Sequence, residues 1–143
     1  MKHITVFAIA VCLLAGFASV GTASAQDHAA RATVPFSFNV GDKWVPAGTY
    51  LITSDVTNPV VIAIHSADGK IVSLSVTQND GRRLNTGKLV FTKYGDQYFL
   101  HEILCSLCGM NVAFPDSKHE KLTRTRFEAG LLSPTDVYLA LVH

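Results

Sequence analysis

Two cysteines three residues apart carry the clearest chemical signal in the chain, in the run Cys105-Ser106-Leu107-Cys108-Gly109. Such a pair can act as a redox couple, usually at a helix N-terminus where the dipole lowers the thiol pKa. It can also supply two of the four ligands of a zinc site, or accept a mixed disulfide. Here the pair follows a strand-like run. We therefore favour a local disulfide, or two packed thiols, in a turn.

A zinc site at the cysteines would need further ligands, and the candidates are His101 and His119. His101 stands four residues before Cys105 on an expected strand. At about 3.3 Å per residue, the two lie roughly 13 Å apart if that strand is straight. They could share an ion only across a sharp bend. We expect no metal site and no cofactor.

Motifs of known catalytic sites are missing from the sequence. It contains no G-x-S-x-G elbow, H-E-x-x-H pair, P-loop or G-x-G-x-x-G run. Most aspartates fall in predicted turns, where turn chemistry explains them; they are Asp42, Asp68, Asp80, Asp96 and Asp116. The sequence gives no reason to bring the histidines together with a nucleophile. We therefore expect a protein that is not an enzyme.

Trp44 is the candidate binding residue, because an aromatic ring beside a turn is not needed for strand packing. The other aromatic residues are expected to pack along strands. A basic segment at residues 118–126 is interrupted by Glu120, which favours an ordinary solvated face over an anion-binding surface.

The first 25 residues have the pattern of a secretory signal peptide. Lys2 and His3 precede a run of about 15 mostly apolar residues, too short for a membrane span of about 20. Ala23-Ser24-Ala25 fits a cleavage site before Gln26. We expect export to the periplasm or the extracellular space, where disulfides form. The expected organisation is a signal peptide at 1–25, a linker at 26–32 and one β domain at 33–143, without a transmembrane span in the mature chain.

Charge argues against nucleic acid as a partner. The chain has 143 residues and a formal net charge of +1, and loss of Lys2 with the leader leaves 11 basic and 11 acidic residues. A nucleic-acid-binding domain usually carries a basic excess. The partner classes left open are a cell-envelope polymer, a lipid or a protein.

Period-two alternation between Gly and Pro turn signals dominates the mature region. Residues 60–66 and 71–77 flank Asp68-Gly69, which predicts a hairpin with a two-residue type I′ turn. Residues 88–94 and 97–104 flank Gly95-Asp96, which predicts a second hairpin with a type II′ turn, apolar on both faces and therefore central. The face of the first hairpin expected in the core carries Val61, Ala63, His65, Val72, Leu74 and Val76.

Only one stretch is helix-like, at residues 117–128. Ser117 is its expected N-cap, with Glu120 three residues on. About seven strands and this one short helix near the C-terminus predict an all-β fold, a small antiparallel sandwich or barrel. No βαβ alternation is present.

Several longer phrases resemble a known family. The run from Val34 to Lys43, VPFSFNVGDK, and the run from Pro46 to Tyr50, PAGTY, are similar to the opening of a family of small exported bacterial β-rich proteins. Later matching phrases are SADGK at 66–70, LVF at 89–91, YGDQYFL at 94–100 and PDSK at 115–118. The resemblance covers most of residues 32–122. It implies a secreted β domain and brings no established activity, and the cysteine pair is not part of the pattern.

Together these features predict an exported, non-enzymatic β module that serves as a binding or structural protein of the cell envelope. The alternative hypothesis is a thiol-redox or metal-binding protein that uses Cys105 and Cys108.

Overall fold

The computed structural model describes residues 28–82 and 87–142. The expected signal peptide and the start of the expected linker lie outside these residues. The elements in chain order are β1 (Ala29–Val34), β2 (Phe38–Val40), β3 (Lys43–Val45), β4 (Gly48–Ser54), β5 (Val61–Ser66), β6 (Ile71–Val76), β7 (Gln78–Asn79), β8 (Lys88–Tyr94), β9 (Gln97–Cys105), β10 (Met110–Ala113), α1 (Lys118–Ala129) and β11 (Thr135–Ala140). The fold is therefore all-β with one short helix, as predicted.

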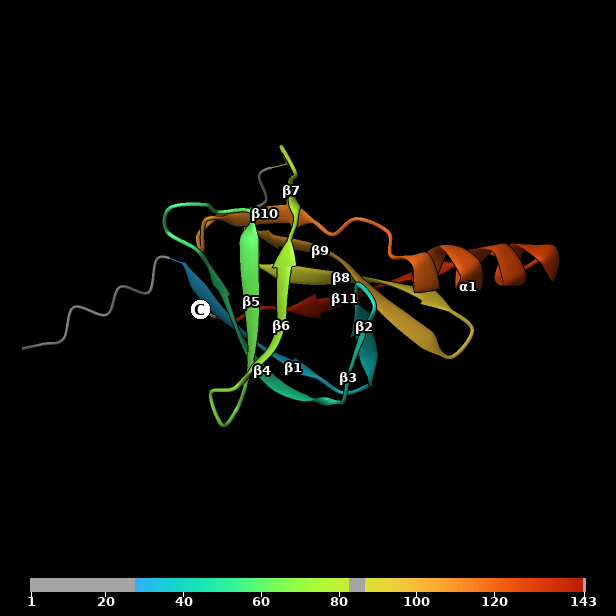
Figure 1. Cartoon of the computed structure of the whole chain (residues 1–143), viewed down its shortest axis with the longest axis horizontal. Helices are drawn as coiled ribbons and strands as arrows, with labels where there is room; N and C mark the ends of the chain where they lie inside the picture. Colours follow the sequence, from blue (N-terminus) through green and yellow to red (C-terminus); the bar gives the residue numbers. More distant parts are fainter. Residues whose placement is uncertain (1–27, 83–86, 143) are drawn as a thin grey trace, which may run out of the picture.

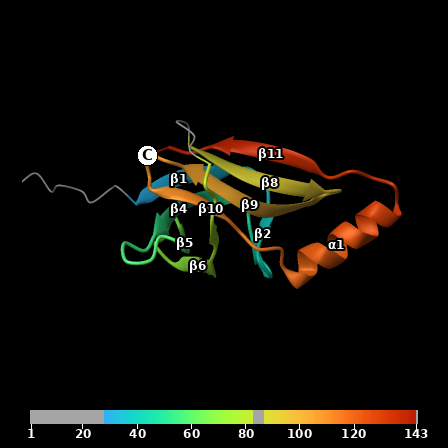
Figure 2. The ribbon, with the colours of Figure 1, turned by 90° about the horizontal axis from the view of Figure 1, so that it is seen from above.

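The strands form two sheets that pack face to face (Figures 1 and 2). One sheet has four strands in the order β1-β4-β5-β6, and the other contains the path β11-β8-β9-β10-β7, with the β2–β3 hairpin beside β9. The described strands number eleven rather than about seven, partly because the short strands β3 and β7 form outside the segments expected to be strands. β1 also begins at Ala29, within the stretch expected to be a linker, and buries Ala30 and Ala32.

The two sheets are joined at both ends of the four-stranded sheet. At the β1 end, Arg31 and Val142 exchange two backbone hydrogen bonds, with N···O distances of 2.7 and 2.9 Å. At the other end, the chain passes from β6 through Thr77 into β7, which pairs with β10 of the second sheet. The core between the sheets is thus enclosed by backbone at two sides.

The β5–β6 hairpin corrects one prediction. Ser66 and Lys70 close a three-residue loop in which Gly69 has φ +80°, instead of the predicted two-residue turn. This loop shifts His65 opposite Ile71, and a bulge at Ile64/His65 restores the expected register further along.

Most of the hairpin face predicted to be core is not in the core, although Val72 of that set packs against it. The buried side chains are Ile62, Ile64 and Ser73, whereas Leu74 and Val76 lie exposed. The two faces of the hairpin differ little in total hydrophobicity. Two branched isoleucines of β5 therefore pack against the second sheet in preference to the smaller alanine and valines of the opposite face.

The β8–β9 hairpin confirms its prediction. Tyr94 lies opposite Gln97, and Gly95 adopts φ +64° as the first turn residue. Its inner face contributes Leu89, Phe91 and Leu100 to the main core, and Phe91 is fully buried. Its other face buries Tyr94 and Phe99 at the end of the sheet nearest α1, where their rings contact Phe127 and His119.

Helix α1 begins where the sequence predicts. The Ser117 side chain accepts a hydrogen bond of 3.1 Å from the Glu120 backbone N–H, as an N-cap does. The helix extends beyond the sheets at one end (Figure 2). Its one buried residue is Glu120, and Leu122 is largely exposed, so an apolar stripe does not anchor it.

Candidate functional site

The predicted binding residue Trp44 lies on β3, opposite Asn39 of β2. Its side chain is 66% exposed. The structure thus places an accessible indole on the surface, but it does not bring His101 or the cysteines to it. A binding role for Trp44 therefore stays a prediction.

Cys105 and Cys108 form a disulfide across the turn between β9 and β10, with Cα atoms 5.2 Å apart. Both residues are buried within the main core cluster. The pair follows a strand and does not precede a helix, so no helix dipole activates it. This environment matches the local structural disulfide expected from the sequence.

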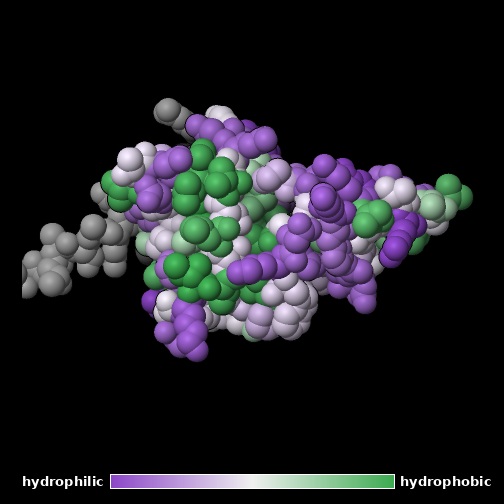
Figure 3. Space-filling view, viewed as in Figure 1, coloured by the Kyte–Doolittle hydropathy of each residue, from purple (hydrophilic) through white to green (hydrophobic). Residues whose placement is uncertain are grey.

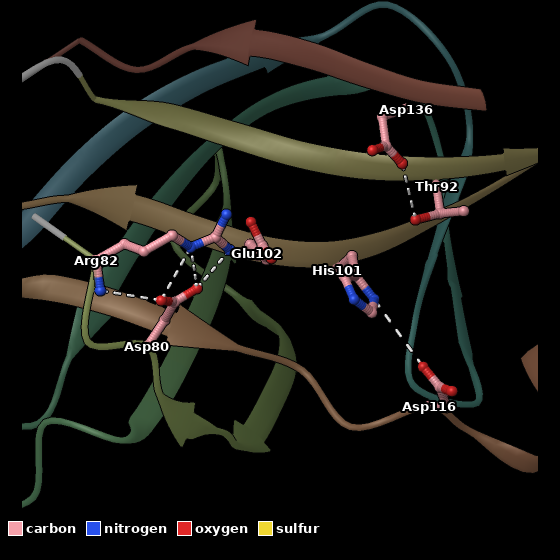
Figure 4. A network of polar contacts seen from close by, with 7 residues as sticks. All are labelled: Asp80, Arg82, Thr92, His101, Glu102, Asp116 and Asp136. Carbon is pink, nitrogen blue, oxygen red and sulfur yellow. Dashed lines mark hydrogen bonds and ion pairs between the residues drawn. The ribbon is translucent and has the colours of Figure 1, made fainter. Parts of the chain in front are cut away.

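His101 lies instead in a polar cluster with Asp116 and Glu120. His101 comes from β9, Asp116 from the loop before α1, and Glu120 from the first turn of α1. One potential ligand atom from each residue lies within 4.8 Å of the other two. The Nδ1 atom of His101 faces Oδ1 of Asp116 at 4.0 Å, as Figure 4 shows. We call these three residues the His101 cluster.

Glu120 is the most buried member of the His101 cluster, with 5% of its surface exposed. Burial raises the pKa of its carboxyl, and the nearby charge of Asp116 raises it further, while His101 and Arg124 lower it. The Ser117 backbone N–H also lowers this pKa, as expected where the two residues form a capping box. Among the residues that the structure describes, no Lys or Arg forms an ion pair with Glu120.

A second feature of the His101 cluster is a buried atom that lacks a hydrogen-bond partner. Nδ1 of His101 is the one buried side-chain nitrogen or oxygen in the described part of the chain that has no hydrogen-bond partner. Asp116 is held from its other side, because Arg124 donates to its Oδ2 atom. Oδ1 of Asp116 therefore stays on the side of the histidine, and one potential ligand atom of each residue lies within 4.8 Å of the other two.

Sequence reasoning did not find this cluster. It weighed His101 only as a partner of the cysteines and assigned Asp116 to a turn and Glu120 to a helix cap. His101, Asp116 and Glu120 are separated by 15 and 4 positions, and the loop after β10 that folds them together has no recognised motif. The one available signal in the sequence was an acidic residue, Glu120, in the first turn of the expected helix. The structure shows that this residue is buried.

A second polar group consists of Asp80, Arg82 and Glu102, and it has a structural explanation. Arg82 donates to both Asp80 and Glu102, linking the segment after β7 to β9 (Figure 4). Hydrogen bonds from the Arg82 side chain lower the pKa of Asp80. Arg82 bonds both carboxylates, so this clamp is explained as a structural ion-pair group that ties the segment after β7 to β9.

The most extensive unusual surface is the outward side of the four-stranded sheet. We call it the outer face, and it comprises Leu51, Val61, Ala63, Ile71, Leu74 and Val76. Register places these side chains next to one another, because Val61 pairs with Val76 and Ala63 pairs with Leu74. Figure 3, which views this side, shows apolar surface gathered over β5 and β6. A hollow of about 480 Å³ adjoins the outer face, lined by residues that include Arg31, Leu51 and His65.

None of the helical segments among residues 28–82 and 87–142 combines the length and apolar character that crossing a membrane requires. Comparison of the chain with family models, with curated proteins and with solved structures found no match in any of the three.

Proposed function

We propose that the chain is an exported, non-catalytic β module that binds another protein through the outer face of its four-stranded sheet. The observation that carries this proposal is the exposure of large aliphatic side chains on the outward side of one sheet. Ile71, Leu74 and Val76 are 58%, 65% and 69% exposed.

Covering the outer face would release substantial free energy. Full burial of one Val, Leu or Ile side chain is worth about 1.5–3 kcal/mol. A patch of such residues is typical of a surface that is buried in a complex. The disulfide, the Arg82 clamp and the core explain the other marked residues, and each of them stabilises the fold without needing a partner.

Strand β6 indicates that the partner presents an extended segment of polypeptide. It is a terminal strand of its sheet and pairs only with β5 among the described residues, whereas the β1 end is closed by the Arg31–Val142 bonds. Residues 71–77 contain no charge and no proline, which are the usual features that keep an edge strand from pairing. The Val72 carbonyl accepts from the Lys43 side chain at 3.3 Å rather than from a strand. An added strand would gain main-chain hydrogen bonds together with apolar contacts.

Export is the second part of the proposal. The charged start, the short apolar run and Ala23-Ser24-Ala25 support cleavage before Gln26. The disulfide agrees with an oxidising compartment. The likeness of VPFSFNVGDK and PAGTY to small exported bacterial β proteins supports the same destination. Intact-mass measurement of the exported protein tests this part: we expect a chain that begins at Gln26, and a mature protein that retains residues 1–25 would overturn it.

Site-specific photocrosslinking in the producing cell tests the binding surface. A benzoylphenylalanine at position 74 should form one adduct with a protein of defined mass. The same probe at Leu122, which is 60% exposed on α1, is the matched control and should not form it. Val76→Lys should abolish the adduct from position 74, because it places a charge in the apolar contact, whereas Leu122→Lys should leave it unchanged.

Three outcomes would overturn the proposal. Equal labelling from positions 74 and 122 would show that the outer face has no preferred partner. An adduct only with lipid or glycan would replace the protein partner by another class. An adduct of twice the mass of the chain would show that a second copy, rather than a different protein, covers the face. Circular dichroism of Val76→Lys, expected to match the parent chain, excludes misfolding as the cause of a lost adduct.

A further inference from the structure

We propose that His101, Asp116 and Glu120 form a binding site for one divalent transition-metal ion of the Zn²⁺ class. The site lies between the side of β9 that faces α1 and the first turn of that helix, away from the outer face. It is independent of the proposed binding function, and it does not involve the cysteines.

The geometry suits a single ion. Three donor atoms, one from each residue, lie within 4.8 Å of one another. Donors bound tetrahedrally to zinc at about 2.0–2.1 Å are separated by about 3.4 Å. The cluster would therefore close by roughly 1 Å, which rotation about the Glu120 and Asp116 side-chain bonds can supply. His101 and Asp116 already lie 4.0 Å apart, between Nδ1 and Oδ1.

One atom without a hydrogen-bond partner and one buried acid lie at this site. The Nδ1 atom of His101 is buried without a hydrogen-bond partner among the described residues. A neutral imidazole nitrogen in that position is a good metal ligand. Glu120 is 5% exposed as a residue, and no Lys or Arg of the described chain forms an ion pair with its carboxyl. A cation between them would give the His101 nitrogen a partner and would balance the charge of the Glu120 carboxylate.

The donor set selects the class of ion. One imidazole and two carboxylates form the mixed nitrogen and oxygen set that Zn²⁺ accepts, often with a fourth position left for water. Ca²⁺ takes six to eight oxygen ligands, which this site does not offer. Arg124 donates to the Asp116 oxygen that does not face His101, so it orients this ligand from outside the site.

Charge and architecture are also compatible with the ion. Two carboxylates face one arginine, which leaves a net negative charge for the cation when both acids are ionised. The partial positive charge of the helix N-terminus opposes a cation, but Ser117 already caps that end. Because α1 buries only Glu120, an ion shared with His101 would fasten the start of the helix to β9.

Calorimetric titration tests the site. The protein is purified without an affinity tag, stripped with EDTA, desalted, and titrated with ZnCl₂ near pH 7 in a non-coordinating buffer. We expect one Zn²⁺ per chain. His101→Ala and Glu120→Gln should each weaken the affinity by at least tenfold, because each removes a ligand. Zn²⁺ should raise the Tm of the parent protein and not that of Glu120→Gln.

Matched controls lie on the same helix. His119→Ala removes a histidine that hydrogen-bonds Gln97 at 3.0 Å and lies outside the cluster, and Glu128→Gln removes an exposed carboxylate. Both should bind Zn²⁺ as the parent does. Circular dichroism of each metal-free variant verifies its fold, and the NMR signals of the His101 ring should shift on addition of Zn²⁺ to the parent protein.

The proposal would be overturned by any of three results: no stoichiometric Zn²⁺ binding, binding that folded His101→Ala and Glu120→Gln retain at full affinity, or Ca²⁺ binding tighter than that of Zn²⁺. The first two would indicate that the cluster is held together by protons and Arg124 alone.

Discussion

Asp80 and Arg82 show how much a surface ion pair contributes in this protein. Arg82 donates to both oxygens of Asp80 and also contacts Glu102, but 56% of its side chain is exposed. Water competes with such a pair, and its net contribution is about 1 kcal/mol or less. The clamp therefore positions the segment after β7 more than it stabilises the whole domain.

The pH dependence of unfolding measures the contribution of Asp80. Its pKa is lowered in the folded state by the Arg82 side chain and backbone N–H. The unfolded chain therefore takes up a proton first as the pH falls, so the stabilisation present above about pH 4 is lost through the acid range below it. Asp80→Asn should lower the free energy of unfolding at pH 7 by up to about 1 kcal/mol and reduce its loss between pH 5 and pH 2.

Urea denaturation across this pH range makes the comparison. Arg82→Gln should cause a similar loss at pH 7, and the double variant should lose less than the sum of the two single losses, because both remove one interaction. If Asp80→Asn keeps the whole acid dependence of the parent chain, Asp80 does not supply the expected part of it.

For single residues, some roles could be predicted from the sequence and others could not. The Ser117 cap and the Cys105–Cys108 disulfide were predictable because each depends on neighbours within three positions. The His101 cluster was not, because its geometry depends on how the loop after β10 returns across β9. A short-range pattern carries no information about that crossing.

At the scale of the element, the β5–β6 hairpin was predicted in position and in most of its register. Four of the expected pairs, Val61–Val76 to Ile64–Ser73, are present. The error was in the turn and in the choice of the inner face. Alternation gives two nearly equivalent faces when both contain aliphatic residues, and the second sheet, distant in sequence, decides between them.

A pair of truncations tests which face is the core. Ile64 is 2% exposed, so Ile64→Ala should create a cavity and lower the free energy of unfolding by about 2–5 kcal/mol. Leu74 is 65% exposed on the neighbouring strand, and Leu74→Ala should change it by no more than about 0.5 kcal/mol. Chemical denaturation of the isolated protein gives both values.

The order of these two effects is the decisive result. A loss at Leu74 equal to that at Ile64 would mean that the outer face is buried in the isolated protein, and it would remove the basis for a docking surface there. The β8–β9 hairpin offers no such ambiguity, because side chains are buried on both of its faces: Phe91 and Leu100 on one, Val90 and Phe99 on the other.

At the scale of the whole molecule, the two sheets are held together by their core and by backbone closure near the C-terminus. The all-β architecture with a single helix was predictable from turn spacing and alternation. The closure was not, because it joins Arg31 to Val142, residues near opposite ends of the described part of the chain. Only the assembled fold brings the edge of β1 beside the segment that follows β11.

Removal of residues 141–143 tests the importance of this closure. Leu141 is buried, its N–H bonds the Gly87 carbonyl at 3.0 Å, and Val142 makes both bonds with Arg31. Loss of one buried leucine side chain costs about 1.5–3 kcal/mol, and each backbone bond adds about 0.5–1.5 kcal/mol. The truncated chain should therefore lose at least about 2 kcal/mol of unfolding free energy. Its free β1 edge should also promote concentration-dependent association.

Removal of His143 alone keeps Leu141 and Val142 in place and should change neither property in denaturation or in light scattering. If the longer truncation behaves like this control, the two sheets are held by the core alone, and β1 does not need its edge covered.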